Sequence, residues 1–371
     1  MTLATTRPGV GLIAGGGVAG AAVACLLGPE ALLIEREAAA HDKICGEFIS
    51  HEAQGYLTRL GIDLTALGAA PIDRVRLVHG NRVACAPLPF RGYGLSRRAL
   101  DAALLAAAAR AGAQVLRGHA VRAVLPEGLD VAGQGKLPGG AVFLATGKHD
   151  LRGVRRTPVH APEDLVGLKM YFRLHPDQAA TLAGHVELLL FRGGYAGLQL
   201  IEDGVANLCL LIRRDRFTAA GADWPGLQEH LERAAPHLRQ RLAGASPLLD
   251  RPLTIFRVPY GYVHQPAAAN LPGLFRLGDQ IAVIPSFSGD GVSIALHTAF
   301  AAVRAYGAAN SAAYHQAMRR DLSGQIARAS HLLRAGRLAP GFAVQAARLW
   351  PGALRWIATM TRVPPWAMLE A

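Results

Sequence analysis

Two short runs of apolar residues near the start of the chain, residues 10–14 and 31–34, predict two buried parallel strands. Between them, an uncharged and alanine-rich stretch predicts a helix that packs on these strands. Gly15, Gly17 and Gly20 separate the first strand from this helix and stand in the spacing GxGxxG. The chain is therefore expected to begin with a strand, a glycine turn, a helix and a second strand.

This unit is typical of a dinucleotide-binding site, because each glycine has a separate mechanical role. Gly15 permits a tight turn, Gly17 lets backbone N–H groups approach a pyrophosphate, and Gly20 lets the helix pack closely on the strand. The diphosphate then lies at the positive end of the helix dipole. Glu35 follows the second strand, where a carboxylate accepts hydrogen bonds from both ribose hydroxyls of an adenosine and repels a 2′-phosphate.

The same segment has a second interpretation as a lipoprotein signal. Residues 8–29 carry no charge and follow Arg7. They contain the run AVAC at residues 22–25. A membrane-inserted stretch gains nothing from its closely spaced glycines, and the acidic residue after the second strand would be a coincidence. The pattern therefore favours the nucleotide-binding unit.

The next elements continue the α/β pattern. Ser96 is expected to cap a helix that extends to residue 112, and strands are expected at residues 113–117 and 119–125. A further buried strand is expected at residues 141–145. The first domain therefore extends well beyond residue 100.

From about residue 166, alternating apolar and polar positions predict a mixed or antiparallel sheet. A helical stretch at residues 224–242 follows these strands, and another strand is expected at residues 253–259. The parallel pattern returns near residue 274, before a glycine turn and a long apolar helix at residues 292–306. The expected strands of the sheet are residues 168–174, 186–191, 197–201 and 206–212.

These elements predict an α/β protein with a discontinuous Rossmann-like domain. Its two parts are residues 1–160 and 266–310, and a β-rich substrate domain at residues 161–265 interrupts them. The C-terminal region, residues 311–371, is expected to be helical, basic and apolar, and Pro351 should break it into short pieces. It is expected to cap a substrate cavity or to contact a membrane surface.

Composition narrows the classes of function. The 371 residues are 51% hydrophobic and 18% charged, which is typical of a compact enzyme rather than a disordered chain. The formal net charge is +12, but the arginines are dispersed and form no basic run, so a nucleic-acid partner is not expected. Apart from the first segment, no stretch reaches transmembrane length without charges or breakers, and a cytoplasmic location is expected.

The cysteines do not indicate a metal site. They are widely separated, form no CxxC pair and have no histidine cluster at ligand spacing, so neither zinc nor another metal is expected. The four cysteines are Cys25, Cys45, Cys85 and Cys209.

Together, several motifs resemble those of the p-hydroxybenzoate-hydroxylase-like flavoproteins, which include aromatic hydroxylases, flavin-dependent halogenases and geranylgeranyl reductases. The resemblance implies that FAD is the cofactor. The motifs are Gly15-x-Gly17-x-x-Gly20 with Glu35, Arg97-x-x-Leu100-Asp101, Ala145-Thr146-Gly147, and Gly278-Asp279 followed by Gly289-x-Gly291.

By this resemblance, Gly278 and Asp279 approach the ribityl chain and pyrophosphate of FAD. Gly289 and Gly291 let a helix N-terminus face the N1–C2=O edge of the flavin, where a reduced flavin carries negative charge. The resemblance also implies that Arg97 contacts the FAD diphosphate and that Val121 lies beside the adenine. From the residues alone, an alternative stays open for both: Arg97 could be a solvated side chain, and Val121 could belong to the core.

Three further residues are candidates for the substrate side. Cys45 and Glu47 lie in a segment that resembles the Cys-Gly-Gly stretch beside the flavin of geranylgeranyl reductases, with Glu47 in place of the second glycine. An alternative is a loop in which Lys43 pairs with Glu47. Tyr195 follows two glycines, as in the Gly-Gly-Tyr segment of those reductases, and is expected over the substrate cavity or in ordinary sheet packing.

Departures from the family pattern bear on the reaction. Thr146-Gly147 replaces the Asp-Gly pair of aromatic hydroxylases, which weakens the case for direct use of NADPH. Ser286 occupies the position at which the family usually has a proline, and Pro285 stands one place earlier. The glycine turn is therefore expected to differ in conformation. The Trp-x-Trp segment of halogenases does not occur, so halogenation is not expected.

The resulting hypothesis is an FAD-dependent monooxygenase that hydroxylates a hydrophobic aromatic or polyketide-derived, phenolic-lipid-like substrate, with NAD(P)H as the expected reductant. A reductase of isoprenoid double bonds is a nearly balanced alternative, and a non-catalytic flavin electron-transfer protein is a third.

Overall fold

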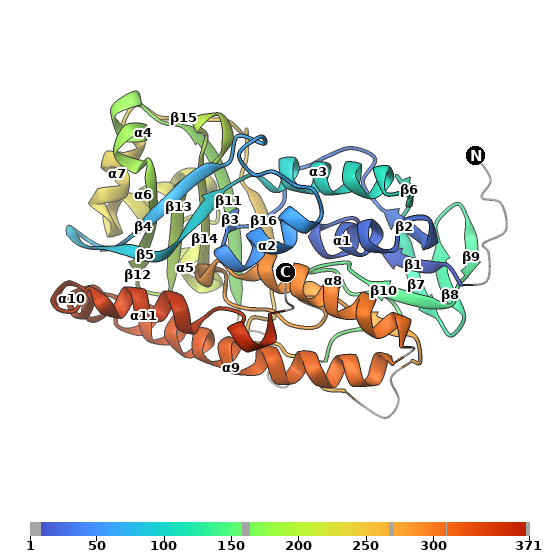
Figure 1. The fold of residues 1–371 in the computed structure, drawn as a ribbon. Helices are drawn as coiled ribbons and strands as arrows, with labels where there is room; N and C mark the ends of the chain where they lie inside the picture. Colours follow the sequence, from blue (N-terminus) through green and yellow to red (C-terminus); the bar gives the residue numbers. More distant parts are fainter. Residues whose placement is uncertain (1–8, 158–163, 267–270, 309, 369–371) are drawn as a thin grey trace.

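A five-stranded parallel sheet, sheet A, forms one half of the molecule in the computed structural model (Figure 1). The structure describes residues 9–157, 164–266, 271–308 and 310–368. Every neighbouring pair of strands in sheet A is parallel. The strand that comes last in the sequence, residues 274–276, follows the strands of a second sheet, which confirms the predicted discontinuous Rossmann-like architecture. The strand order is β17 (Leu274–Arg276), β10 (Ala141–Leu144), β1 (Gly11–Ala14), β2 (Ala31–Glu35) and β6 (Gln114–Arg117).

The alternating side chains of sheet A fill two separate cores. Ile13 and Leu33 face the helices on one side of the sheet, whereas Leu12 and Ile34 face a small three-stranded sheet on the other. Both faces are therefore buried, which explains why these strands are continuous apolar runs. The helices are α1 (Val18–Leu27), α3 (Arg97–Arg110) and α8 (Gly291–Gly307), and the small sheet contains β7 (Val121–Leu125), β8 (Gly128–Val131) and β9 (Gly135–Pro138).

A nine-stranded, mostly antiparallel sheet, sheet B, forms the other half of the molecule (Figure 1). Two of its long strands, β4 and β5, precede α3 in the chain and were not predicted from the sequence. β4 joins the sheet by a parallel pairing with β12. The strands are β3 (Phe48–Ile49), β4 (Ala70–His79), β5 (Arg82–Gly94), β11 (Leu165–Arg173), β12 (Gly184–Phe191), β13 (Gly194–Leu200), β14 (Ala206–Arg213), β15 (Ser246–Pro247) and β16 (Leu253–Phe256).

Short helices surround sheet B. The predicted helical stretch at residues 224–242 is two helices, because Pro236 cannot continue the hydrogen-bonding pattern of the first. Leu227 and Leu231 of the first helix are fully buried against the sheet. The helices are α4 (Pro176–Leu182), α5 (Arg214–Ala219), α6 (Trp224–Ala234) and α7 (Pro236–Leu242). A further short helix, α2 (His51–Arg59), packs mainly on α8, in the core beside sheet A.

Of the three C-terminal helices, the first runs along one side of both halves, and the other two lie beside sheet B (Figure 1). The long α9 (Ser311–Leu338) packs beside α8, and α10 (Pro340–Leu349) and α11 (Gly352–Met360) then pack on β4 and β5. The helices separate at Pro351, as predicted. Within the described ranges, every helix is too short or too polar to span a bilayer.

Candidate flavin site and substrate cavity

Glycine is required at two positions, one in the turn between β1 and α1 and one in the first part of α1. Gly15 has a φ of +106°, and a Cβ there would lie 2.5 Å from the carbonyl oxygen of Ala145. A Cβ on Gly20 would lie 2.0 Å from the carbonyl oxygen of Gly15. Gly17 is the N-cap of α1, so the free N–H groups of this helix open toward the space beyond the turn. The tight turn predicted at Gly15 and the close packing predicted at Gly20 agree with this geometry, and the approach of a pyrophosphate to Gly17 stays a prediction.

A cavity of about 440 Å³ lies beyond this turn, at the carboxyl ends of the strands of sheet A. Its wall includes Gly15, Gly17, Glu35, Arg97 and Val121, all of which were predicted to contact the cofactor. Gly20 lies outside the wall, between α1 and the sheet, as expected for a packing glycine. This cavity is called the nucleotide cavity below.

Glu35 is held at the edge of the nucleotide cavity. One carboxylate oxygen, Oε2, accepts a hydrogen bond from the backbone N–H of Gly16 at 2.6 Å, and Oε1 accepts one from the backbone N–H of Glu37 at 2.9 Å. These bonds fix the carboxylate next to the glycine turn, where the ribose of an adenosine is expected.

Arg97 is part of a buried charge cluster rather than a solvated side chain. Its Nε and Nη2 donate to the two carboxylate oxygens of Asp101 at 3.0 and 2.9 Å, and Lys43 Nζ donates to the same carboxylate at 2.7 Å. Burial raises the pKa of Asp101, but the charges of Arg97 and Lys43 outweigh it and hold that pKa below its usual value. Two cations and one anion beside Gly17 leave the positive charge that a diphosphate requires.

Replacing Arg97 with alanine should weaken FAD binding by roughly 10- to 100-fold, the expected loss for one hydrogen bond to a charged group. Asp101 keeps Lys43 as a partner in this variant, so the fold should survive. Binding is measured by titrating the apoprotein with FAD, with the quenching of flavin fluorescence as the signal. Arg110→Ala is the matched control, since Arg110 is exposed at the other end of α3 and lines neither the nucleotide cavity nor its neighbours. Equal affinities for the two variants would exclude Arg97 from the cofactor site.

A second cavity of about 160 Å³, the flavin cavity, shares Gly17, Arg97 and Asp279 with the nucleotide cavity. Gly278 and Gly291 also line it. Beside them, α8 begins at Gly291 and directs its unpaired N–H groups to this side.

Gly289 also lines the flavin cavity and cannot be replaced without strain. It has a left-handed conformation with a φ of +69°, and a Cβ there would lie 2.7 Å from the ring of Phe48. Pro285, Ser286 and Ser288 form the short 3₁₀ turn that precedes it. The distant glycine motifs therefore meet the first turn around one space, as the resemblance implied.

Lys148 is a cation at this site that the sequence analysis did not identify as functional. It follows β10, lines both the nucleotide and flavin cavities, and donates to the carbonyl oxygen of Ile44 at 3.0 Å. Burial lowers the pKa of Lys148, but Tyr260 and Asp279 outweigh this effect and raise it above its usual value. A cation thus lies close to the position at which hydroxylases have their Asp-Gly pair.

Cys45 lines the flavin cavity, and the neighbouring Glu47 is almost fully buried. The carboxylate of Glu47 forms an ion pair with Lys169 and accepts hydrogen bonds from the Tyr171 hydroxyl and the Arg97 N–H, both at 2.8 Å. Burial raises the pKa of Glu47, and the charge of Lys169 opposes this shift. The alternative in which Lys43 pairs with Glu47 is wrong, because Lys43 pairs with Asp101.

Polar side chains from three neighbouring strands of sheet B hold the loop that contains Cys45. Lys169 on β11 donates to the carbonyl oxygen of Lys43 at 3.0 Å, and Asn207 on β14 donates to that of Gly46 at 2.9 Å. Gln199 on β13 donates to the carbonyl oxygen of Glu47 at 2.8 Å. The sequence analysis missed these residues, although single polar side chains within apolar strands are a usable signal.

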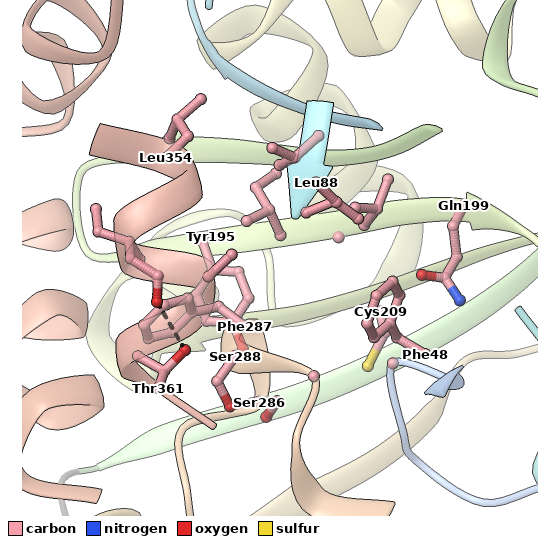
Figure 2. Close-up of a pocket in the computed structure, with 18 of the residues that line it drawn as sticks. Phe48, Leu88, Tyr195, Gln199, Cys209, Ser286, Phe287, Ser288, Leu354 and Thr361 are labelled. Atoms are coloured by element: carbon pink, nitrogen blue, oxygen red, sulfur yellow. Dashed lines mark hydrogen bonds between the residues drawn. The ribbon is translucent and has the colours of Figure 1, made fainter. Parts of the chain in front are cut away.

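A third cavity of about 110 Å³, the apolar cavity, adjoins the flavin cavity (Figure 2). Tyr195, Cys209 and Gly289 line both spaces. Tyr195 is buried and packs edge-on against Phe287, with ring centroids 6.1 Å apart, so it is both a sheet side chain and a cavity wall. The other apolar wall residues are Phe48, Val75, Leu88, Val186, Leu188, Phe287, Leu354, Ile357 and Ala358.

The C-terminal helix α11 forms one wall of the apolar cavity. Leu354 and Thr361 lie on one side of this space in Figure 2, and Gln199 and Cys209 lie on the other. The guanidinium of Arg362 also lines the wall and stacks over the ring of Phe90 at 4.8 Å. The C-terminal region is therefore a cap on a cavity beside the flavin site.

Comparisons with known proteins identify the fold. No family model and no curated protein matches this chain. Among solved structures, the flavin-dependent brominase Bmp2 aligns over 98% of this chain and 96% of its own, with a TM-score of 0.78 and 16% identity. The P. aeruginosa PqsL, in complex with 2-aminobenzoylacetate, aligns over 91% of this chain and 100% of its own, with a TM-score of 0.69 and 18% identity.

A geranylgeranyl bacteriochlorophyll reductase-like protein of Thermoplasma acidophilum aligns over 98% of this chain and 95% of its own, with a TM-score of 0.67 and 18% identity. The chain has the fold that these solved structures share. This confirms the family resemblance at the level of the fold. Identities below one fifth do not transfer a reaction or a substrate from any of these proteins.

The described residues of this flavoprotein fold fit FAD. Gly15 and Gly17 line the nucleotide cavity at the expected pyrophosphate, and Arg97 and Lys43 supply positive charge there. The glutamate at the ribose end and the α8 N-terminus at the ring end complete a donor set of the kind that this cofactor needs.

Proposed function

We propose that this protein is an FAD-dependent monooxygenase that hydroxylates a small, apolar aromatic compound, with NAD(P)H as the reductant. One atom of dioxygen is inserted into a ring C–H bond, and the other leaves as water with the two electrons that NAD(P)H supplies. FAD, when bound, supplies the activation of dioxygen. The protein binds the substrate, orients it and excludes water.

The observation that carries this proposal is the size and position of the apolar cavity. Its volume of about 110 Å³ is of the same order as the ~150 Å³ cavity that holds benzene in an engineered protein. It is well below the roughly 300–1,000 Å³ typical of pockets for larger ligands. A single aromatic ring is therefore the best match, and it would lie next to the flavin cavity through the shared residues Tyr195 and Gly289.

The polar groups around this space suit orientation rather than acid catalysis by Glu47. Its carboxylate is already bound to Lys169, Tyr171 and the Arg97 backbone. Glu47 therefore acts in this proposal by fixing the loop that presents Cys45. The N–H groups at the start of α8 offer electrostatic support to negative charge on the reduced cofactor.

A reductase of isoprenoid double bonds is the second candidate, and the position of Cys45 in the wall of the flavin cavity favours it. A long isoprenoid needs α11 to move away from the cavity, because the apolar space beneath this helix is small. An electron-transfer protein is less well supported, since it needs no enclosed apolar cavity beside the cofactor. The likeness to a brominase is one of fold, and the Trp-x-Trp segment is absent from the sequence.

Reaction of the reduced holoprotein tests the proposal. The FAD-loaded protein should oxidise NAD(P)H faster when monocyclic phenols or anilines are added, and labelled dioxygen should place one labelled atom in the product. Anaerobic consumption of a polyprenyl substrate with no oxygen incorporation would select the reductase instead. A halogenated product in the presence of bromide or chloride would contradict the proposed reaction.

Replacing Leu354 with phenylalanine should raise the substrate KM by roughly 10-fold or more, because the larger side chain occupies space beneath α11. The affinity for FAD should not change, since Leu354 does not line the nucleotide or flavin cavity. Leu349→Phe is the control, because Leu349 is exposed. Identical steady-state kinetics for the two variants would place the substrate elsewhere.

A further inference from the structure

The outer surface of the C-terminal helices exposes large apolar side chains. Ten such side chains are exposed among the described residues, and six of them lie between the end of α9 at residue 338 and residue 366. Two of the most exposed are Phe342 at 77% and Leu349 at 79%. The six are Leu338, Phe342, Leu349, Trp350, Trp356 and Trp366.

The helix α10 is apolar on both of its faces. Its inner residues Val344 and Ala347 are buried against β4 and β5. Its outer residues Phe342, Ala346 and Leu349 follow the spacing i, i+4 and i+7, so they lie on one face of the helix. This outer face is not required for the core of the protein, and Figure 1 shows α10 and α11 on the outside of the molecule.

The charge of this region is strongly positive. Residues 322–368 contain no aspartate or glutamate. Arg348 and Arg355 are exposed and directly precede Leu349 and Trp356. The six arginines of the segment are Arg328, Arg334, Arg337, Arg348, Arg355 and Arg362.

We propose that α10, α11 and the segment around Trp366 dock the protein on an anionic lipid membrane. Exposed tryptophans and leucines beside arginines are typical of helices that lie in the membrane interface, with the arginines at the acidic headgroups. A second copy of this chain is a poorer partner, because a twofold contact through this surface would bring arginines against arginines.

Docking in this orientation has a consequence for access to the apolar cavity. Arg355 and Trp356 of α11 are exposed, whereas Leu354 and Ile357 of the same helix line the cavity. Only the thickness of α11 then separates the membrane from the substrate site. An apolar substrate dissolved in the bilayer can therefore reach this side of the protein without crossing water.

The test is flotation of the FAD-loaded protein with vesicles of phosphatidylcholine alone and with vesicles that also contain phosphatidylglycerol. Binding should be at least roughly 10-fold stronger to the anionic vesicles and should weaken as salt is added. Three of the four tryptophans lie in the proposed contact, so brominated lipids should quench most of the tryptophan fluorescence. Flavin content and oxidation of NAD(P)H without vesicles report separately on the proposed reaction.

Two paired variants identify the surface. Leu349→Ser with Trp350→Ser should lose vesicle binding by roughly 10-fold or more, and so should Arg348→Glu with Arg355→Glu. The matched controls, Phe256→Ser and Arg122→Glu, change an exposed aromatic and an exposed arginine elsewhere and should bind as the wild type does. Unchanged flavin content and melting temperature show that each variant is folded.

Three results would overturn this proposal. They are the absence of binding to anionic vesicles, equal binding to neutral vesicles, and equal losses in the contact variants and their controls. Light scattering measures the oligomeric state of the wild type and of the contact variants. A dimer that the Leu349→Ser, Trp350→Ser variant dissociates, without any vesicle binding by the wild type, would assign this face to a second copy of the chain.

Discussion

Replacing Gly15 with alanine should remove FAD from the protein and lower the free energy of unfolding by roughly 3 kcal/mol or more. The φ of +106° at this position is strained for any residue with a Cβ. The new methyl group would also lie 2.5 Å from the carbonyl oxygen of Ala145, and this backbone atom belongs to the neighbouring strand end and cannot rotate away. Urea unfolding and the flavin absorbance of the purified protein measure the two effects.

Gly55→Ala is the matched control for this substitution. Gly55 is exposed within α2, has ordinary helical geometry, and has no heavy atom within 4 Å of the position of an added Cβ. Alanine there should stabilise the protein by about 0.5–1 kcal/mol and leave the flavin in place. A Gly15→Ala protein that unfolds with the wild type and remains yellow would show that the turn does not hold the cofactor.

The nucleotide-binding unit could be predicted because all of its determinants are local in the sequence. The buried strands, the glycine spacing and Glu35 lie within one short segment, and each residue type there has a single mechanical explanation. The return of the parallel sheet at β17 was also predictable, since Gly278-Asp279 repeats the pattern of a strand that ends in a tight turn.

The composition of sheet B could not be predicted from local patterns. The strands β4 and β5 belong to it only because β4 pairs with β12, more than 100 residues later in the chain. The β-strand propensity of a segment does not indicate which distant strand it pairs with. Burial of the two strands against each other determines this pairing. For the same reason, the isolated polar residues Lys169, Gln199 and Asn207 could be noticed within their apolar strands, but their contacts with the loop of Cys45 could not be predicted.

The two readings of the C-terminal region were a cap and a membrane contact, and the helices can serve both. One face of α11 lines the apolar cavity, and the opposite face exposes Trp356. A helix that is apolar on more than one face has to be covered on each of them. The protein core covers the inner face, and the proposed bilayer covers the outer one.

Asp290 should make the folded protein less stable as the pH rises, and Asp290→Asn should remove this dependence. The carboxyl group is fully buried between Gly289 and Gly291, and burial raises its pKa to about 7, although Arg362 partly opposes the shift. In the unfolded chain the same group loses its proton near its ordinary pKa of about 3.9. Its protonation therefore contributes stability that is fully present below about pH 4 and is lost as the pH rises through about 7.

The size of the effect follows from the difference between the two pKa values. Each pKa unit corresponds to about 1.4 kcal/mol, so a loss of roughly 4 kcal/mol is expected for the wild type between pH 4 and pH 8 relative to Asp290→Asn. Urea unfolding of both proteins across this range measures the difference, and Asp63→Asn is the control, because Asp63 is an exposed carboxylate that also accepts backbone hydrogen bonds. Parallel stability profiles for the wild type and Asp290→Asn would contradict the raised pKa.

The position of Asp290 connects this titration to the cap. Its Oδ2 accepts a hydrogen bond from the backbone N–H of Val363 at 3.1 Å, in the segment that follows α11, and its Oδ1 lies 3.5 Å from Arg362 Nη1. The residue thus joins the flavin-facing start of α8 to the end of the helix that covers the apolar cavity. Because Asp290→Asn keeps an oxygen that can accept from Val363, the cap should stay in place while the pH dependence disappears. A variant that instead loses substrate binding at every pH would show that the charge of Asp290 is needed to hold the cap.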